Sequence, residues 1–293
     1  MRQETTKHGG KLLHRMEFDG VQDFVSTLSQ TKYVPHLTAF NSMFGNHLAS
    51  SRWIGRQYPN GWKSVFEAAN GQWEEGLATV TEMEEELTEM IPAPEARVRR
   101  RRWSDDGDDI CLDRMRSGQD YWVRCQRVAI EAPQVVTLVT NISTPGTMDH
   151  RDILWRGAAA IAATVLLEQA GFRVELVCVD RTDRTYANGD GYMSALWLKR
   201  AGDMLDRASL VSAISGWFYR TMFFASTVIP ATPNTPLWPT TGLGSCRSAD
   251  QDDLAWLCPG PWHSLPDRCY SRQAAMQAVK TLLATINTQK EAA

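Results

Sequence analysis

The loop that follows residue 140 gathers the side chains of this sequence that could bind a ligand or do chemistry. It reads "NISTPGTMDHRD" over residues 141–152 and offers amide, hydroxyl, carboxylate and imidazole groups. A further carboxylate, Asp180, ends the segment "RVELVCVD". Hard divalent cations prefer oxygen ligands. Ser143 and Asp149 are therefore candidate ligands for Mg²⁺ or Mn²⁺, and His150 is a candidate base at a helix start.

These groups can act together only if regular elements bring them to one place. The run "VVTLVTN" is rich in β-branched residues, which is typical of a strand buried in a parallel sheet. A helix is expected to begin near Asp149–Asp152, to run through "ILWRGAAAIAATVLLEQA" and to end at Gly171. "RVELVCVD" then forms a second strand. A strand–helix–strand segment of this length predicts a parallel βαβ unit.

The carboxyl ends of two neighbouring parallel strands lie at one edge of a sheet, where open α/β sheets bind ligands. The loop and Asp180 are thus expected to line one crevice. Its predicted lining residues are Asn141, Ser143, Thr144, Thr147, Asp149, His150 and Asp180. The alternative is that these residues only cap strand and helix ends, with His150 exposed to solvent.

Arg156 lies one turn into the apolar helix, so a carboxylate or carbonyl partner is expected for it. Asp180 or Asp152 could supply that partner, and substrate binding is the functional alternative. Trp262 and His263, in a loop after a strand predicted at "DLAWLCPG", are expected on the same edge of the sheet.

The remaining pattern predicts the organisation of the chain. Residues 1–15 are polar and are expected to be flexible. Residues 16–128 read as a helical region followed by a charged β-hairpin, and residues 129–293 as one α/β domain. The alternating segment "YMSALWLKR" follows an Asn-Gly turn and predicts an antiparallel edge strand. The predicted fold is α/β: a three-layer, Rossmann-like, mostly parallel sheet with that edge strand.

This element order resembles a von Willebrand factor A-like domain. Such domains carry a metal-dependent adhesion site whose first element is Asp-x-Ser-x-Ser after the first strand. The matching positions here are Asn141, Ser143 and Pro145. The sequence keeps one residue of the three and lacks the anionic ligand, so the resemblance implies the fold with a degenerate metal site.

Two longer segments, "NGWKSVFEAANGQWEEG" and "ILWRGAAAIAATVLLEQAGFRVEL", look like a family of uncharacterised proteins common in phages and other mobile elements. The resemblance covers the chain from about Phe44 onward. It implies a phage-like setting and no particular reaction.

The segment "ARVRRRRWSDDGDDI" places a basic run before an acidic Asp-Gly turn. A hairpin in which the two charges partly cancel is one reading. The other is a phosphate-binding stripe, because arginines neutralise nucleic-acid phosphates. The arginines of this stripe are Arg97, Arg99, Arg100, Arg101 and Arg102.

Composition narrows the class of protein. A net charge of −3 and a pI near 6.1 argue against wholesale electrostatic binding of nucleic acid or membranes. The six cysteines form no CxxC pair, and the first residues lack the apolar core of a signal peptide, so a cytosolic chain with reduced thiols is expected, in the host cytosol if a phage encodes it. The sequence also contains no Gly-rich phosphate loop, no GxSxG and no HExxH.

The leading hypothesis is a non-enzymatic binding or assembly module with a protein partner. The partner would contact the loop at residues 141–152 and the Trp-rich loops. No cofactor and no membrane are expected. One alternative is nucleic-acid binding through Arg97–Arg102 in phage replication or genome handling. Another is a metal-dependent enzyme that uses Asp149 and Asp180 with Mg²⁺ or Mn²⁺.

Overall fold

The predicted strand–helix–strand unit is present in the computed structural model. Strand β6 (Val135–Asn141), helix α7 (His150–Gln169) and strand β7 (Arg173–Asp183) follow one another, and β6 pairs with β7 in parallel. The Asp149 carboxylate caps α7 by accepting a hydrogen bond from the Arg151 amide, at 3.0 Å. Gly171, with φ of 87°, follows the end of α7 in a conformation that suits glycine.

The structure describes residues 1–8, 10–30, 54–56, 58, 61–89, 101–104, 109–125, 134–183, 190–227 and 245–292.

Five more strands complete a seven-stranded sheet around β6 and β7. They are β1 (Arg2–His8), β2 (Lys11–Phe18), β8 (Gly191–Lys199), β9 (Ser245–Arg247) and β10 (Trp262–Ser264). The order is β1-β2-β8-β7-β6-β10, and β9 pairs with the end of β7. The pairs β2–β8, β6–β7 and β6–β10 are parallel, whereas β1–β2, β7–β8 and β7–β9 are antiparallel. The predicted Rossmann-like α/β class is confirmed.

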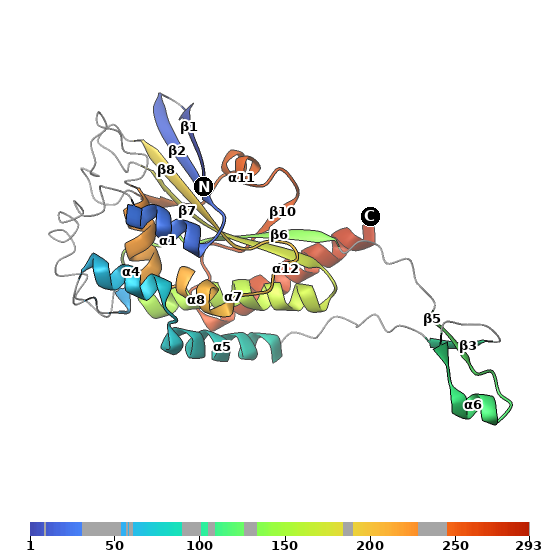
Figure 1. Ribbon diagram of the computed structural model, residues 1–293. Coiled ribbons are helices and arrows are strands. Elements are labelled where there is room, and N and C mark those ends of the chain that lie inside the picture. The colour runs from blue at the N-terminus through green and yellow to red at the C-terminus, as the bar shows by residue number, and fades with distance from the viewer. Residues whose placement is uncertain are drawn as a thin grey trace.

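Helices cover the two faces of this sheet unequally (Figure 1), with α5, α7 and α8 on one side and α11 on the other. The helices of the described chain that belong to this body are α1 (Val21–Gln30), α4 (Trp62–Asn70), α5 (Glu74–Glu89), α7, α8 (Arg207–Ala213), α9 (Gly216–Phe218), the π-helix η2 (Tyr219–Phe223), α10 (Phe224–Ser226), α11 (Gln251–Leu257) and α12 (Arg272–Ala292). The layers are thus a thick helical layer, the sheet and a thin layer around α11.

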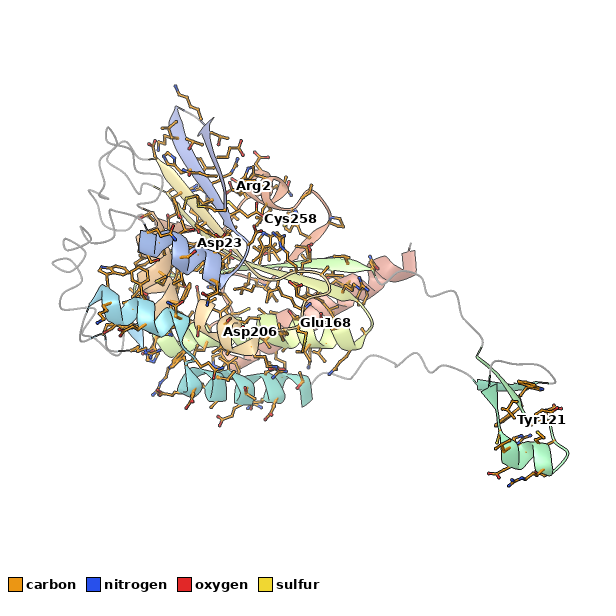
Figure 2. All side chains as sticks on the ribbon, in the orientation of Figure 1. Arg2, Asp23, Tyr121, Glu168, Asp206 and Cys258 are labelled. Atoms are coloured by element: carbon orange, nitrogen blue, oxygen red, sulfur yellow. The ribbon has the colours of Figure 1, made fainter. Side chains whose placement is uncertain are left out.

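The alternation of side chains along the strands divides the core. Leu176 and Cys178 of β7 face the thick helical layer, where they pack with α7 and α9. Val177 and Val179 face the opposite way and pack against Leu254 of α11. In Figure 2 the labelled Arg2 and Cys258 belong to this second side, where the Arg2 guanidinium donates to the Trp256 carbonyl oxygen at 2.6 Å.

The start of the chain differs from the sequence prediction. Residues 1–15 were expected to be flexible, yet β1 and β2 form a hairpin that continues the sheet, with β2 parallel to β8. Met16 and Phe18 of β2 are buried under α1. This burial stabilises the hairpin, because the polar strand β1 buries little apolar area of its own. Strand β8 is antiparallel to β7, as predicted. Because β2 pairs with its other side, β8 lies inside the sheet, and β1 is the strand at that edge.

Three short strands within residues 101–104 and 109–125 form a separate small sheet in place of the predicted simple hairpin. Strand β3 (Arg101–Ser104) and strand β4 (Asp109–Ile110) both pair with β5 (Trp122–Cys125), which lies between them. The short helix α6 (Leu112–Arg116) connects β4 towards β5. The prediction that the segments flanking the Asp-Gly turn pair with each other is therefore wrong, and the turn residues 105–108 lie outside the described residues.

The strand predicted at "DLAWLCPG" is also wrong, because residues 251–257 form helix α11. Asp250 caps this helix by accepting from the Asp253 amide at 2.9 Å, and the Asp253 carboxylate accepts from the Asp250 amide in return. This reciprocal capping box satisfies two backbone amide donors at the start of the helix, so Asp250 and Asp253 favour a helix over the predicted strand.

Asp253 also joins α11 to the sheet. Its fully buried carboxylate accepts from the Arg15 guanidinium of β2 at 2.9 Å and from the Arg181 guanidinium of β7 at 3.0 Å. The ion pairs tie two strands and one helix that are far apart in sequence. Removal of the carboxylate would leave two poorly solvated guanidinium groups close together.

We expect Asp253→Ala to lower the free energy of unfolding by about 3–5 kcal/mol, because it breaks a buried ion-pair network. Chemical denaturation measures this loss. The matched control is Asp252→Ala, an exposed carboxylate in the same helical turn, for which we expect a loss below about 1 kcal/mol. Equal losses in the two variants would show that the Asp253 ion pairs do not hold α11 on the sheet.

Candidate functional site

The candidate site lies where β6, β7 and β10 end. The chain passes from β6 through α7 to β7 on one side, whereas β10 pairs with β6 on the other side. This reversal makes the carboxyl end of β6 a topological switch point, the usual ligand position in open α/β sheets. The loop from Ile142 to Asp149, which we call the crevice loop, leaves β6 at this point.

Four of the predicted crevice residues are buried and hydrogen-bonded within the protein. The Asn141 Oδ1 atom accepts from the Ser143 amide at 2.9 Å, and its Nδ2 atom donates to the Arg247 carbonyl oxygen of β9 at 3.0 Å. The Ser143 hydroxyl donates to the Asp180 carboxylate at 2.6 Å, and the Thr144 hydroxyl to the Ile142 carbonyl oxygen at 2.9 Å. The structure therefore brings Asn141, Ser143, Thr144 and Asp180 together, as predicted, with their polar atoms directed at one another.

Asp180 is the most unusual titratable group of this set. Its side chain is fully buried, and within the described chain its Oδ2 atom has no hydrogen-bond partner. Ser194 of β8 lies opposite Asp180 in the strand register, and its hydroxyl also has no partner among the described residues. Burial raises the pKa of Asp180 to about 6, although the Ser143 hydroxyl and Arg181 oppose that rise.

Arg156 is buried, as its position in the apolar helix predicted, but neither Asp180 nor Asp152 is its partner. Its guanidinium donates to the carbonyl oxygens of Asn141 and Ser143, the second at 3.2 Å, and to the Asp267 carbonyl oxygen and the Tyr270 hydroxyl. The side chain thus bridges the loop after β6 and the loop after β10. A structural role in fixing both loops accounts for every bond that it makes.

Sequence reasoning missed two residues of the π-helix η2 that hold the crevice loop. The Tyr219 hydroxyl accepts from the Thr144 amide at 3.1 Å, and the buried Arg220 guanidinium donates to the Met148 carbonyl oxygen at 2.7 Å. Burial raises the pKa of Tyr219 and lowers the pKa of Arg220 to about 10. A charged residue within the apolar run "SGWFYRTMFF" was the available signal.

The other predicted site residues lie at the rim of the crevice. Thr147 is exposed, and Asp149 caps α7 while its carboxylate pairs with the His150 Nδ1 atom at 3.1 Å. Ser143 and Asp149, the predicted metal ligands, are thus engaged with different partners. Among the described residues no three His, Cys, Asp or Glu side chains cluster in a way that could hold a metal ion.

The predicted positions of Trp262 and His263 differ from the structure. Trp262 and His263 belong to strand β10, and Trp262 pairs with Thr137 near the start of β6, so they lie away from the crevice. Cys246 of β9 is close enough to Asp180 and Arg156 to sense their charges, but burial raises the pKa of its thiol. A raised pKa disfavours the thiolate that a nucleophilic cysteine needs.

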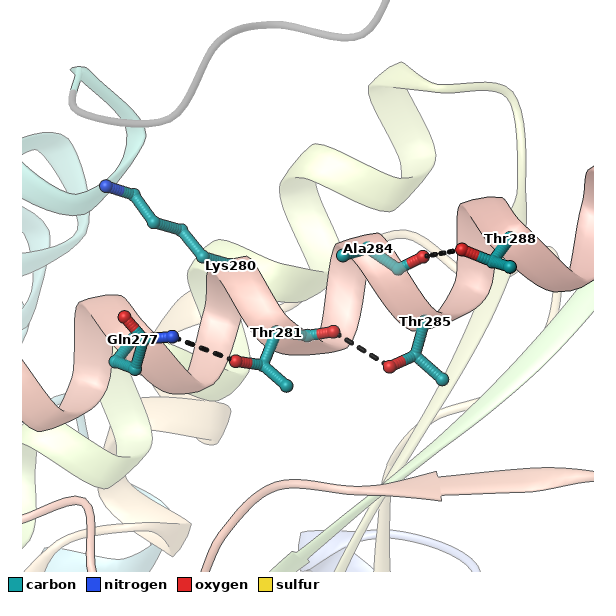
Figure 3. Close-up of a pocket in the computed structure, with 6 residues that line it drawn as sticks. All are labelled: Gln277, Lys280, Thr281, Ala284, Thr285 and Thr288. Atoms are coloured by element: carbon teal, nitrogen blue, oxygen red, sulfur yellow. Dashed lines mark hydrogen bonds between the residues drawn. The ribbon is translucent and has the colours of Figure 1, made fainter.

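A hollow of about 390 Å³ runs along the outer face of α12 (Figure 3). It is lined by Gln277, Lys280, Thr281, Ala284, Thr285 and Thr288. Its polar groups are satisfied along the helix: the Gln277 amide donates to the Thr281 hydroxyl at 3.1 Å, and the Thr285 hydroxyl donates to the Thr281 carbonyl oxygen at 2.9 Å. We assign no ligand to this open, polar surface.

The raised pKa of Asp180 predicts a pH dependence of stability. A carboxyl group whose pKa rises from 3.8 to about 6 on folding binds its proton more tightly in the folded chain. Its stabilising contribution is full below the unfolded pKa and is lost as the pH rises through about 6. Asp180→Asn keeps an acceptor for Ser143 and cannot ionise. We expect the variant to gain roughly 3 kcal/mol of unfolding free energy relative to the wild type between about pH 4 and about pH 7.

Denaturant unfolding across this pH range measures the difference between the two proteins. Asp252→Asn, which changes an exposed carboxylate, is the control and should follow the wild type. If the wild type and Asp180→Asn showed parallel pH profiles, the assignment of the titrating group to Asp180 would be wrong.

Comparisons with known proteins give one match. No curated protein and no solved structure matches the chain. Among the described residues no helix has the length and apolar character needed to cross a membrane. A family model described as a domain of unknown function, DUF7192, matches residues 5–287, so the chain belongs to the DUF7192 family.

Proposed function

We propose that the chain is a macromolecule-binding module, with a protein as its partner, and that the crevice loop is its recognition loop. The observation that carries this proposal is the way in which the loop is held. Side chains from three other elements bind it: Asp180 of β7, Arg156 of α7, and Tyr219 and Arg220 of η2.

The bonds to this loop involve buried atoms, whereas its tip is open. Ile142, Ser143 and Thr144 are buried, and Pro145, Gly146 and Thr147 are exposed. A loop with a fixed backbone loses less conformational entropy on binding, which raises affinity without additional contacts. The tip therefore has the properties of a preorganised contact surface.

A metal-dependent activity at Ser143, Asp149 and Asp180 stays a prediction, as does the von Willebrand A-like resemblance that suggested it. Metal binding by Ser143 would require its hydroxyl to leave Asp180. Metal binding by Asp149 would require its carboxylate to leave the Arg151 amide in the first turn of α7. The binding proposal requires no such rearrangement.

A substitution at the tip of the loop tests the binding proposal. We expect Thr147→Arg to reduce partner capture at least about tenfold, because a long charged side chain replaces a small one at the contact surface. The measurement is chemical cross-linking of the purified chain in extracts of its source, followed by identification of the cross-linked peptides.

Met204→Arg is the matched control, because Met204 is 94% exposed in the turn between β8 and α8. It should leave capture unchanged. Cross-links that avoid residues 142–149, or equal capture by the two variants, would refute the assignment of the crevice loop as the contact surface.

A second candidate function is nucleic-acid binding by the small sheet of β3, β4 and β5, which resumes the alternative based on Arg97–Arg102. Strand pairing places Arg102 of β3 opposite Arg124 of β5. Trp103, next in β3, is 41% exposed, and the Arg114 guanidinium lies 4.4 Å from the centre of its ring. Trp103 and Arg114 together suit a base and a phosphate of a single strand, whereas the register positions of Arg102 and Arg124 belong to the other face of the small sheet. Arg97, Arg99 and Arg100 lie outside the described residues.

This candidate predicts binding of a fluorescent single-stranded oligonucleotide that weakens as salt rises. Each arginine that neutralises a phosphate contributes about 0.7 to the slope of log affinity against log salt. We expect Arg102→Ala and Arg124→Ala each to lower the slope by about that amount, measured by fluorescence anisotropy. Lys280→Ala, on the exposed face of α12, should leave it unchanged. Affinity that did not depend on salt would exclude a phosphate stripe.

A further inference from the structure

Three buried hydrogen-bond donors gather beside α9, and none of them has an acceptor within the described chain. They are the Arg56 Nη1 atom, the Tyr58 hydroxyl and the Trp217 Nε1 atom. The Arg56 guanidinium lies 5.5 Å from the centre of the Trp217 ring, and the Tyr58 ring centre lies 6.1 Å from that of Trp217. The three side chains therefore form one cluster, which we call the donor cluster.

The donor cluster packs close to the start of α7. Gly55 has φ of 85°, and a Cβ atom at this position would lie 2.5 Å from the His150 Cδ2 atom. Gly216, next to Trp217, is similarly close to His150, with 3.1 Å from such a Cβ to the His150 Cβ atom. The approach at Gly55 requires glycine, and the one at Gly216 is tight, so Gly55 and helix α9 lie close against the first residue of α7.

A set of donors without acceptors is unusual inside a protein. Buried polar groups are almost always hydrogen-bonded, and a guanidinium group normally gains a carboxylate, carbonyl or phosphate partner. Burial raises the pKa of Tyr58 even though the Arg56 charge opposes the rise, so the phenol keeps its proton and remains a donor. An indole N–H and a guanidinium group can only donate. A bound cation would be repelled by the Arg56 charge, whereas an anion could accept hydrogen bonds from donors of this cluster.

We propose that Arg56, Tyr58 and Trp217 bind an oxyanion, a phosphate or carboxylate group carried by a small molecule or by a partner. Arg56 supplies the compensating charge, and the two neutral donors fix the orientation of the oxygen atoms. This inference concerns a site other than the exposed tip of the crevice loop and does not depend on the proposed function.

Titration calorimetry of the full chain with inorganic phosphate, and separately with acetate, tests the proposal at constant ionic strength. We expect binding of at least one of these probes to the wild type. Tyr58→Phe removes one hydroxyl and preserves the ring, so it should weaken binding about tenfold, the loss of one hydrogen bond to a charged group. Arg56→Leu should abolish binding.

Tyr121→Phe is the matched control, because it removes a phenol hydroxyl from the small sheet, and it should bind like the wild type. Thermal unfolding of all variants in phosphate separates binding from the general stabilisation by excluded salts, which raises every melting temperature alike. A response to phosphate alone assigns a phosphoryl ligand, and a response to acetate assigns a carboxylate.

The proposal is refuted if neither probe binds, or if Tyr58→Phe and Arg56→Leu bind as tightly as the wild type. Neither result affects cross-linking through Thr147, so failure of the donor cluster and failure of the recognition loop can be told apart.

Discussion

The buried guanidinium of Arg156 is the constraint on which the carboxyl edge of the sheet depends. A positive charge inside the helical layer is tolerated only if most of its donors are satisfied, and of the Arg156 nitrogens only Nε lacks a partner among the described residues. Here the partners are carbonyl oxygens of Asn141, Ser143 and Asp267, and the Tyr270 hydroxyl. Both β6 and β10 must therefore end where their carbonyl groups can turn towards α7. The same requirement fixes the path of the crevice loop, because the last residue of β6, Asn141, and Ser143 of the loop provide two of the acceptors.

The two faces of the sheet are fixed by different means. On the thin side, Asp253 of α11 holds guanidinium groups of β2 and β7 through ion pairs. On the thick side, Arg156 donates to the Ser143 carbonyl oxygen and Arg220 donates to the Met148 carbonyl oxygen. An ion pair fixes two side chains, whereas an arginine that donates to carbonyl oxygens fixes backbone. The crevice loop is thus held through its backbone, which is what the proposed recognition role requires.

The sequence predicts those parts of the fold whose signals are local. The β-branched run of β6, the apolar α7 and Gly171 identify the βαβ unit because each element is specified by its own residues. Strand β1 could not be recognised, since "RQETTKH" has no apolar alternation and is a strand only through pairing with β2. Helix α11 was missed for another reason: Asp250 and Asp253 form a capping pair three residues apart, a local signal that outweighs the apolar character of "LAWL". The Tyr219 and Arg220 contacts depend on a fold that brings η2 to the loop, which no spacing in the sequence encodes.

The same distinction separates the location of a site from its chemistry. Strand order was enough to bring Asn141, Ser143, Thr144 and Asp180 to one edge, but the direction of their hydrogen bonds was not predictable. A cation held by Ser143 and Asp149, the predicted metal ligands, would have to draw Ser143 away from Asp180 and Asp149 away from the start of α7. The proposed anion would displace no hydrogen bond of the Arg56 Nη1 atom, the Tyr58 hydroxyl or the Trp217 Nε1 atom, because these donors have no acceptor among the described residues. The proposed anion therefore requires no change in these contacts, whereas a metal ion held by Ser143 and Asp149 requires both side chains to leave their partners.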